Sequence, residues 1–169
     1  MCEPEMLAKT GRSVEQHQEL TVASVLELRA MGVKVIPVLQ GWTMGQYFDC
    51  VELYSKNGIE LRSEPVVGLG SVCRRQRMTS AALIVSMLAD EGISLHGFGF
   101  KASGLQAVAD KMRSADSLAW SLNARKSSPR PECLGKHQSC SNCADFALEW
   151  RDSLLGKLGK EFLQVQRCA

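Results

Sequence analysis

A chain of 169 residues with 45% hydrophobic content can bury one real core, which excludes disordered and fibrous proteins. The formal net charge of +2 permits a nucleic-acid partner without requiring one. No apolar run is long enough for a membrane helix and the N-terminus lacks a signal-peptide pattern, so we expect a cytoplasmic protein without a membrane partner. The seven cysteines are then expected as thiols or metal ligands rather than disulfides.

Short apolar runs alternate with segments of helical periodicity along the chain. A helix is expected from Ser13 to Gly32 and another from Thr43 to Gly58, because each begins with a capping-residue pattern. Further helices are expected over residues 79–92, from Ser103, and over about 142–155, with a final amphipathic segment ending near Val165. The expected strands are residues 33–39, 65–69, 93–98 and 114–120. Continuous apolar strands linked by helices predict a parallel sheet.

Each expected strand ends in residues that are suited to binding or catalysis. These ends are Gln40-Gly41, Gly68-Leu69-Gly70, His96-Gly97 and Asp116-Ser117. In parallel α/β folds, ligands bind at the carboxyl ends of the strands. The sequence therefore predicts that these residues gather at one site.

Four strand–helix units make half of a (β/α)8 TIM barrel, which typically needs about 250 residues. We expect an α/β fold in which residues 1–126 form the last four βα units of a partial barrel. Residues 127–169 are expected to form a zinc-binding loop and C-terminal helices. A small open α/β domain is the alternative, although Cys2 and Glu3 look like the end of a preceding strand.

A cluster of cysteines and histidine precedes the last expected helix. It reads Cys133-x3-His137-x2-Cys140-x2-Cys143. Three thiolates and an imidazole suit tetrahedral zinc, whereas the alternative is a chance cluster of thiols in a loop. We expect a structural zinc ion that ties this loop to the following helix.

The order and spacing of the strand ends resemble the tRNA-guanine transglycosylase superfamily over most of the chain. The segment from Gly68 to Gln76, with Ala119-Trp120-Ser121 and a Cys/His cluster after it, is most similar to the DpdA-like branch, which puts 7-deazaguanines into DNA. The resemblance implies the C-terminal half of such an enzyme. Its implied partners are DNA, less so tRNA, and a 7-deazaguanine base.

By this resemblance, Asp116 is the nucleophile that traps the sugar carbon as a covalent intermediate during base exchange. The resemblance also implies a substrate site made of Gln40, Gly41, Gly68, Leu69, Gly70, His96 and Arg125. Taken alone, Asp116 also suits a helix cap and the glycines suit tight packing. His96 suits either a satisfied core histidine or a pocket residue.

The sequence departs from the superfamily in two ways. The usual zinc ligands are three closely spaced cysteines and a later histidine, but no histidine follows His137. In the family, the general base is an Asp in the N-terminal half of the barrel, and no residue of this sequence replaces it. Glu3 corresponds only loosely to an acidic segment that contacts the incoming base. A nucleophile without a proton-handling partner is a poor catalyst.

Different classes of function therefore stay open. The first is a transglycosylase, or half of one, that exchanges guanine for a 7-deazaguanine. The second is a non-catalytic remnant or zinc-stabilised nucleic-acid-binding module, in which Arg74, Arg75 and Arg125 hold phosphates and Trp42 or Trp120 stacks on bases. A third is a subunit that completes a barrel with a second chain. These clustered arginines also suit a solvent-exposed face that binds no partner.

Overall fold

The computed structural model describes residues 2–72, 79–100 and 102–158. The chain divides into two compact units, residues 1–116 and residues 117–169. The division after residue 116 places helix α6 (Ala119–Arg125) in the second unit, whereas the sequence predicts a boundary after residue 126. Within the described ranges, none of the helices combines the length and the apolar character of a membrane-spanning segment.

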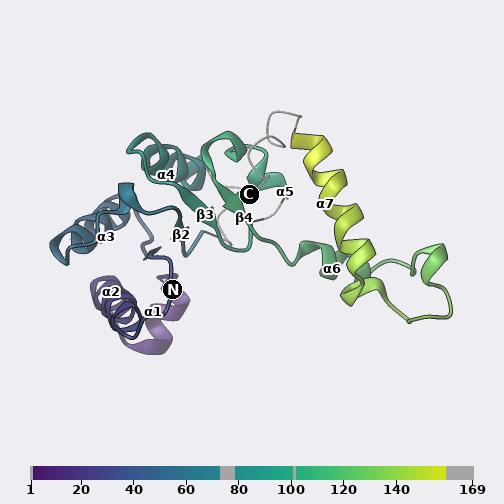
Figure 1. Cartoon of the computed structure of the whole chain (residues 1–169), viewed down its shortest axis with the longest axis horizontal. Coiled ribbons are helices and arrows are strands. Elements are labelled where there is room, and N and C mark those ends of the chain that lie inside the picture. Colours follow the sequence, from purple (N-terminus) through teal and green to yellow (C-terminus); the bar gives the residue numbers. More distant parts are fainter. Residues whose placement is uncertain (1, 73–78, 101, 159–169) are drawn as a thin grey trace. The chain divides into compact units, whose positions relative to one another are not determined.

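The first unit is built on a parallel sheet in the order β1-β2-β3-β4 (Figure 1). Its strands are β1 (Val38–Leu39), β2 (Val67–Leu69), β3 (Leu95–Gly97) and β4 (Ser114–Ala115). The predicted parallel sheet is confirmed, although each strand is shorter than the apolar run that indicated it. The sheet is open among the described residues, and it does not show a TIM barrel.

Helices follow and precede the strands as the periodicity indicates. The helices are α1 (Pro4–Thr10), α2 (Val14–Ala30), α3 (Met44–Lys56), α4 (Thr79–Asp90), α5 (Ala102–Leu105), α6 (Ala119–Arg125) and α7 (Ala144–Leu158). Short 3-10 turns are η1 (Leu61–Ser63), η2 (Ala109–Lys111), η3 (Pro131–Cys133) and η4 (Cys140–Asn142). Ser13 and Thr43 both form full capping boxes with the glutamine three residues later, which confirms both predicted helix starts.

The strand expected over residues 114–120 is wrong in its second half. The chain leaves the sheet after Ala115, and α6 begins at Ala119. The Ser117 hydroxyl accepts a hydrogen bond from the Ala119 amide at 3.2 Å, and Leu118 has a turn-like φ of −89° and ψ of 7°. This local turn chemistry overrides the apolar run.

The long helix expected from Ser103 is also wrong. The structure has the single turn α5 and then η2, and Met112 returns to an extended conformation. Gly104 lies inside this segment, where a glycine weakens a helix interior. At the N-terminus, Cys2 and Glu3 are not in a strand, and Pro4 opens α1 at a position where proline is favoured.

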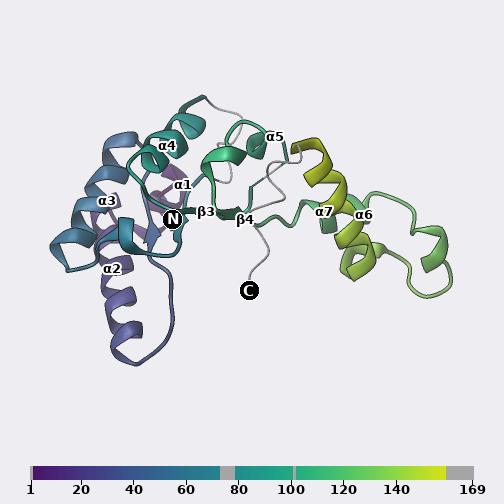
Figure 2. The same cartoon turned by 45° about the horizontal axis from the view of Figure 1, so that its top comes forward.

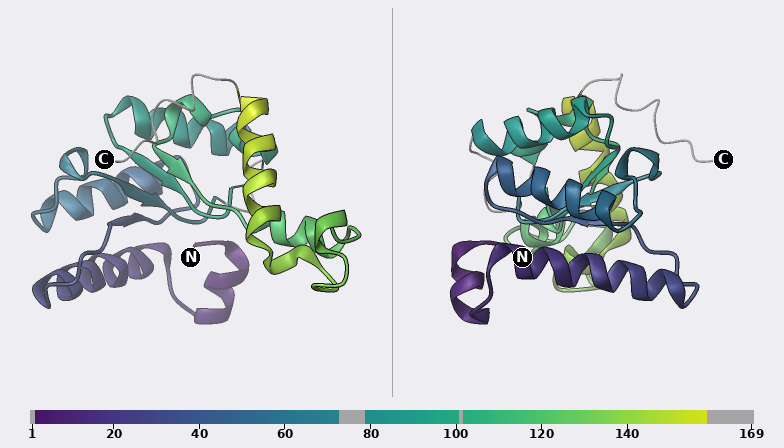
Figure 3. Two further views of the ribbon diagram at one scale, coloured as in Figure 1. Left: turned by 45° about the vertical axis from the view of Figure 1, so that its right-hand side comes forward. Right: turned by 90° about the vertical axis from the view of Figure 1, so that its left-hand side faces the viewer.

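The two faces of the sheet differ in chemistry. Leu39, Leu69 and Leu95 are fully buried. A Cβ added to Gly97 would collide with Phe100 and Met112, so the chain packs closely on this apolar side. In Figure 3, α3 and α4 lie along one side of the strands, and α2 packs against α3 and β1. The segment after α2 runs back along that helix to reach β1 (Figure 2).

The outer edge of β1 is closed by side chains. The Leu39 carbonyl accepts a hydrogen bond from the Gly70 amide, just after β2. Because successive residues of a strand direct their backbone groups to opposite sides, those of Val38 and Gln40 point away from β2. The Val38 amide donates to the Tyr54 hydroxyl at 3.0 Å, and that hydroxyl donates to the Val38 carbonyl at 3.1 Å. Gln18 Nε2 donates to the Gln40 carbonyl at 2.7 Å. These bonds satisfy backbone groups that an edge strand otherwise exposes.

The second unit has a much smaller core. Among its described residues, 117–158, the buried ones are Ala124, Cys133 and Cys140, and the partly buried Cys143 and Phe146 pack against them. Helix α6 contacts η4 and α7, which gathers the cysteines between the two helices. The described part of α7 has no buried residue.

Candidate functional site

Residues from all four strands meet on one face of the sheet. The register pairs Val38 with Gly68, Gly68 with His96, and His96 with Ser114, and paired residues of neighbouring strands point to the same side. Contacts described below place further side chains on this face, just beyond the strand ends. The predicted site residues that share this face are Gln40, Gly68, Gly70, His96 and Asp116. We call it the open face.

At the β1 and β2 ends, Gln40 and Gly70 are in close contact. A Cβ at Gly70 would lie 2.9 Å from Gln40 Oε1, so only glycine fits here without displacing the amide. The Ser71 hydroxyl donates to Gln40 Oε1 at 3.4 Å and accepts a hydrogen bond from the Cys2 amide at 2.8 Å. The Tyr47 hydroxyl fixes the Gly70 carbonyl at 2.7 Å.

Ser71 itself has an unusual backbone conformation. Its φ of +59° lies in the left-handed region, and the side chain is buried. Non-glycine residues with this geometry are uncommon and concentrate at functional sites. The turn after β2 is therefore shaped by its contacts with Cys2 and Gln40 rather than by local preference.

Glu3 places a buried carboxylate next to this turn. The residue is 4% exposed, and its Oε2 atom has no hydrogen-bond partner among the described residues. A buried polar oxygen without a partner costs free energy. The atom is thus an acceptor available to a donor group of a ligand.

At the β3 and β4 ends, His96 bridges Ser114 and Asp116. His96 Nδ1 lies 2.8 Å from the Ser114 hydroxyl, and Nε2 lies 3.5 Å from Asp116 Oδ2. The other carboxylate oxygen, Oδ1, accepts a hydrogen bond from the Gly99 amide at 2.5 Å. The Asp116 side chain is 58% exposed, whereas that of His96 is 20% exposed. The carboxylate is therefore oriented by the protein and reachable from solvent.

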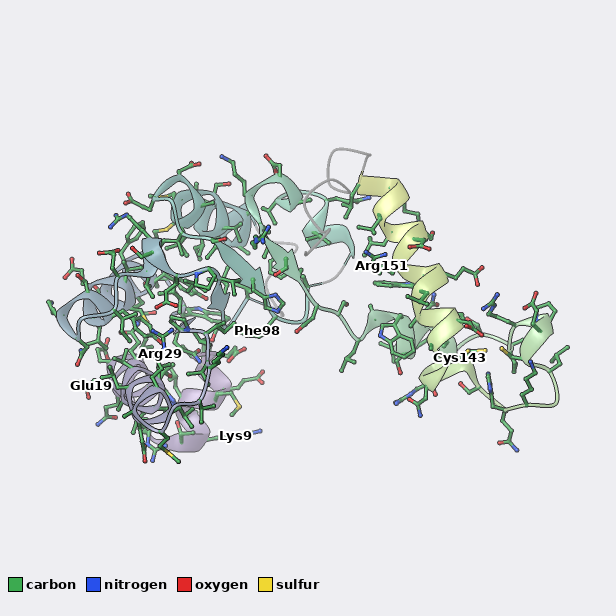
Figure 4. All side chains as sticks on the ribbon, in the orientation of Figure 1. Lys9, Glu19, Arg29, Phe98, Cys143 and Arg151 are labelled. Carbon is green, nitrogen blue, oxygen red and sulfur yellow. The ribbon has the colours of Figure 1, made fainter. Side chains whose placement is uncertain are left out.

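Phe98 covers the strand position next to His96. Its ring meets the His96 ring edge-on, with centroids 4.9 Å apart and planes at 72°. The same ring lies 2.5 Å from the point where a Gly68 Cβ would be. Gly68 thus makes room for the aromatic ring at the end of β3, where Figure 4 labels Phe98.

The second unit contains a candidate metal centre. The ligand atoms of Cys133, His137, Cys140 and Cys143 all lie within 4.8 Å of one another. Cys133 Sγ and Cys143 Sγ are 3.9 Å apart, and His137 Nε2 is 3.2 Å from Cys140 Sγ. A tetrahedral zinc ion with Zn–S bonds of about 2.3 Å holds two thiolates about 3.8 Å apart. This donor set could hold a metal ion.

Comparison with known families settles the relationship of the chain. Residues 1–164 match the family model described as DpdA, DeoxyPurine in DNA protein A. The chain belongs to the DpdA family. This is a tRNA-guanine transglycosylase-like family of DNA modification, so the predicted relationship is confirmed. No curated protein and no solved structure matches the chain.

Two residues expected in the DpdA-type site, Leu69 and Gly41, lie away from the open face. Leu69 is fully buried in the core, and Gly41 packs against the start of α3, where its Cβ would lie 3.0 Å from the Tyr47 amide nitrogen. Arg125 is exposed at the end of α6, in the second unit. Arg74 and Arg75 lie outside the described residues.

Sequence reasoning missed Ser71, Phe98 and Ser114. Each stands in a segment that the motifs already marked, but only the pairing of neighbouring strands brings it to the open face. Ser114 was placed in a strand without a role, although it lies two residues before Asp116 and so shares its side of the chain. That alternation is the signal that could have identified it.

Backbone amides near the metal centre support the ligands. The Arg130 amide donates to Cys140 Sγ at 3.4 Å. The amides of Phe146 and Asp145, at the start of α7, lower the pKa of the Cys143 thiol, while burial raises the pKa of Cys133 to about 11. Figure 4 labels Cys143 beside the sulfur atoms of this cluster.

Proposed function

We propose that this chain takes part in exchanging guanine for a 7-deazaguanine base in DNA, with Asp116 as the nucleophile. Membership of the DpdA family favours DNA over tRNA. The observation that carries the proposal is the Asp116 carboxylate, which is exposed and yet fixed by Gly99 and faced by His96. Its place is the carboxyl end of a parallel strand, where such folds bind substrates.

The proposed reaction has two displacement steps at one sugar carbon. A carboxylate oxygen of Asp116 attacks C1′ of the deoxyribose, the C1′–N9 bond breaks, and guanine leaves with the electron pair and takes up a proton. The incoming base loses its N9 proton and attacks C1′, which releases the carboxylate. No external oxidant or reductant is needed.

Base recognition is proposed for the β1 and β2 ends. A guanine-like base presents N–H donors, and Glu3 Oε2 and Gln40 Oε1 are acceptors. Gly70 leaves room for the Gln40 amide because it lacks a Cβ, which would lie 2.9 Å from Gln40 Oε1. Arg125 is proposed to contact a phosphate of the DNA strand.

The wider architecture is part of the proposal. The open four-strand sheet fits a section of a (β/α)8 barrel, and further strands, from the same or a second chain, would enclose the open face. A cytoplasmic location stays a prediction. We propose that Cys133, His137, Cys140 and Cys143 hold structural zinc, which would tie the loop to α7 without entering the base exchange.

Incorporation of isotope-labelled guanine into duplex DNA by the full chain tests this function without knowledge of the natural base. We expect Asp116→Asn to lower incorporation at least about 100-fold, because the covalent step is lost. Asp110→Asn, which changes an exposed aspartate on η2, is the matched control and should exchange normally.

Undiminished incorporation by Asp116→Asn would contradict the assignment of the nucleophile. DNA binding that falls steeply with salt, without any exchange by the wild-type chain, would instead favour the non-catalytic reading.

A further inference from the structure

Ser114, His96 and Asp116 form a continuous polar chain across β3 and β4. The register pairs His96 with Ser114, and Asp116 follows two residues after Ser114. The imidazole therefore lies between the two, 2.8 Å from the hydroxyl and 3.5 Å from the carboxylate. Among the described residues, Asp116 is the charged group that contacts the His96 ring.

The chemistry of these groups selects one proton arrangement. An ionised carboxylate only accepts hydrogen bonds, so the histidine nitrogen facing Asp116 must carry the proton. The other nitrogen, Nδ1, is then an acceptor, and the Ser114 hydroxyl is the donor. The partner of one imidazole nitrogen decides the tautomer at the other.

We propose that Ser114 and His96 are positioning residues, in which Ser114 holds the imidazole as the Nε2–H tautomer and Nε2–H orients the Asp116 carboxylate. The inference rests on the proposed function only for the role of Asp116 as nucleophile. With Gly99 on Oδ1 and His96 on Oδ2, both oxygens are held and each keeps a lone pair for attack on C1′.

The surroundings of His96 restrict the ring to this orientation. Phe98 contacts it edge-on at 4.9 Å, and the absence of a side chain at Gly68 lets Phe98 lie there. A larger residue at position 68 would displace Phe98 and free the imidazole. The 3.5 Å separation from Asp116 is long for a hydrogen bond, and such contacts commonly tighten when substrate binds.

Nitrogen NMR of the histidine rings in the full chain tests the arrangement without requiring activity. The chain has three histidines, so His96→Gln identifies the His96 signals. We expect the Nε2–H tautomer for neutral His96, an increase in the other tautomer in Ser114→Ala, and recovery in Ser114→Thr. A dominant Nδ1–H tautomer in neutral His96, or a tautomer ratio that Ser114→Ala leaves unchanged, would overturn the proposal.

A pair of substitutions tests the positioning role in base exchange. His96→Gln keeps a donor near the Nε2 position, whereas His96→Asn keeps only a group near Nδ1. We expect His96→Asn to lower kcat about 10- to 100-fold with little change in the KM for the base, and His96→Gln to recover much of it. Equal rates for His96→Asn and wild type, with Asp116→Asn inactive, would overturn the positioning role alone. Full activity of Asp116→Asn would remove the proposed function instead.

Discussion

The two units of this chain are stabilised by different means. The first buries large apolar side chains from strands and helices, including Tyr47, Tyr54, Leu39 and Leu88, at less than 2% exposure. In the second, the buried core consists of one alanine and two cysteines among the described residues. The first unit thus has a substantial apolar core, whereas so small a core as that of the second needs an additional constraint. A metal ion held by Cys133, His137, Cys140 and Cys143 would provide that constraint.

The two units also differ in where their polar side chains lie. The open face of the first unit carries polar groups that are held in place but not used by the core, namely Gln40, His96 and Asp116. The polar groups of the second unit converge on one another instead. The first unit therefore combines a rigid apolar core with exposed polar groups, whereas the second has a donor set that could hold a metal ion. The predictions below separate these two cases.

Metal removal should have the largest effect, and it should be confined to the second unit. Binding of structural zinc contributes on the order of 10 kcal/mol in small domains, because the ligand set forms only in the folded state. We expect a chelator, or Cys140→Ser, to abolish protection of the α7 amides from hydrogen exchange while the β2 and β3 amides stay protected. Cys50→Ser, at a buried cysteine of the first unit, is the control and should leave α7 protected. Loss of protection in both units together would contradict the division.

Tyr54→Phe should destabilise the first unit and leave the second unchanged. The substitution removes one hydroxyl that serves both the amide and the carbonyl of Val38, at a cost of about 1–3 kcal/mol. Urea unfolding, followed through amide exchange in β1 and in α7, measures both units at once. Unchanged stability of the first unit in Tyr54→Phe would contradict the role of Tyr54 at the β1 edge.

Alkaline pH should weaken the first unit through the same tyrosine. Burial raises the pKa of Tyr54 to about 12 from an ordinary value of 10.0. The unfolded chain therefore loses this proton first, so the stabilising contribution is complete below pH 10 and falls as pH rises toward 12. Stability measured against pH should decline more steeply in wild type than in Tyr54→Phe over this range. Parallel curves would show that Tyr54 does not titrate as its burial requires.

The smallest expected effect is at the ion pair between α2 and the segment before β2. Arg29 donates two hydrogen bonds of 2.8 Å to the Glu64 carboxylate, and the pair is partly buried. Glu64→Gln should cost about 0.5–1 kcal/mol in the first unit. Glu52→Gln breaks the exposed pair with Lys56 and should be neutral. If Glu64→Gln and Glu52→Gln change the melting temperature equally, the partial burial of the Arg29–Glu64 pair adds no stability.

Local features were well predicted from the sequence. The capping residues Ser13 and Thr43 act within one helical turn, and the cysteine spacing around His137 brings the metal ligands together through local chain geometry. The parallel sheet followed from apolar runs separated by helices. These properties depend on neighbours in sequence, which is why pattern alone identifies them.

Features that depend on distant contacts were missed. The bridge from Ser114 through His96 to Asp116 requires the register of β3 against β4, which no single segment encodes. The role of Gly68 as space for Phe98 depends on a contact across strands. Likewise, the expected strand over residues 114–120 ended early because Ser117 begins a turn that the apolar pattern does not reveal.

The most direct measurement is the position of the covalent sugar on the protein. The full chain is incubated with guanine-containing duplex DNA, denatured to trap any adduct, digested with nuclease and trypsin, and mapped by mass spectrometry. Cleavage after Arg113 and Arg125 releases a peptide, residues 114–125, in which Asp116 is the single carboxylate side chain. The account predicts a deoxyribosyl adduct on this peptide in wild type and none in Asp116→Asn. A sugar attached to any other peptide, or exchange of bases without an adduct on Asp116, would contradict it.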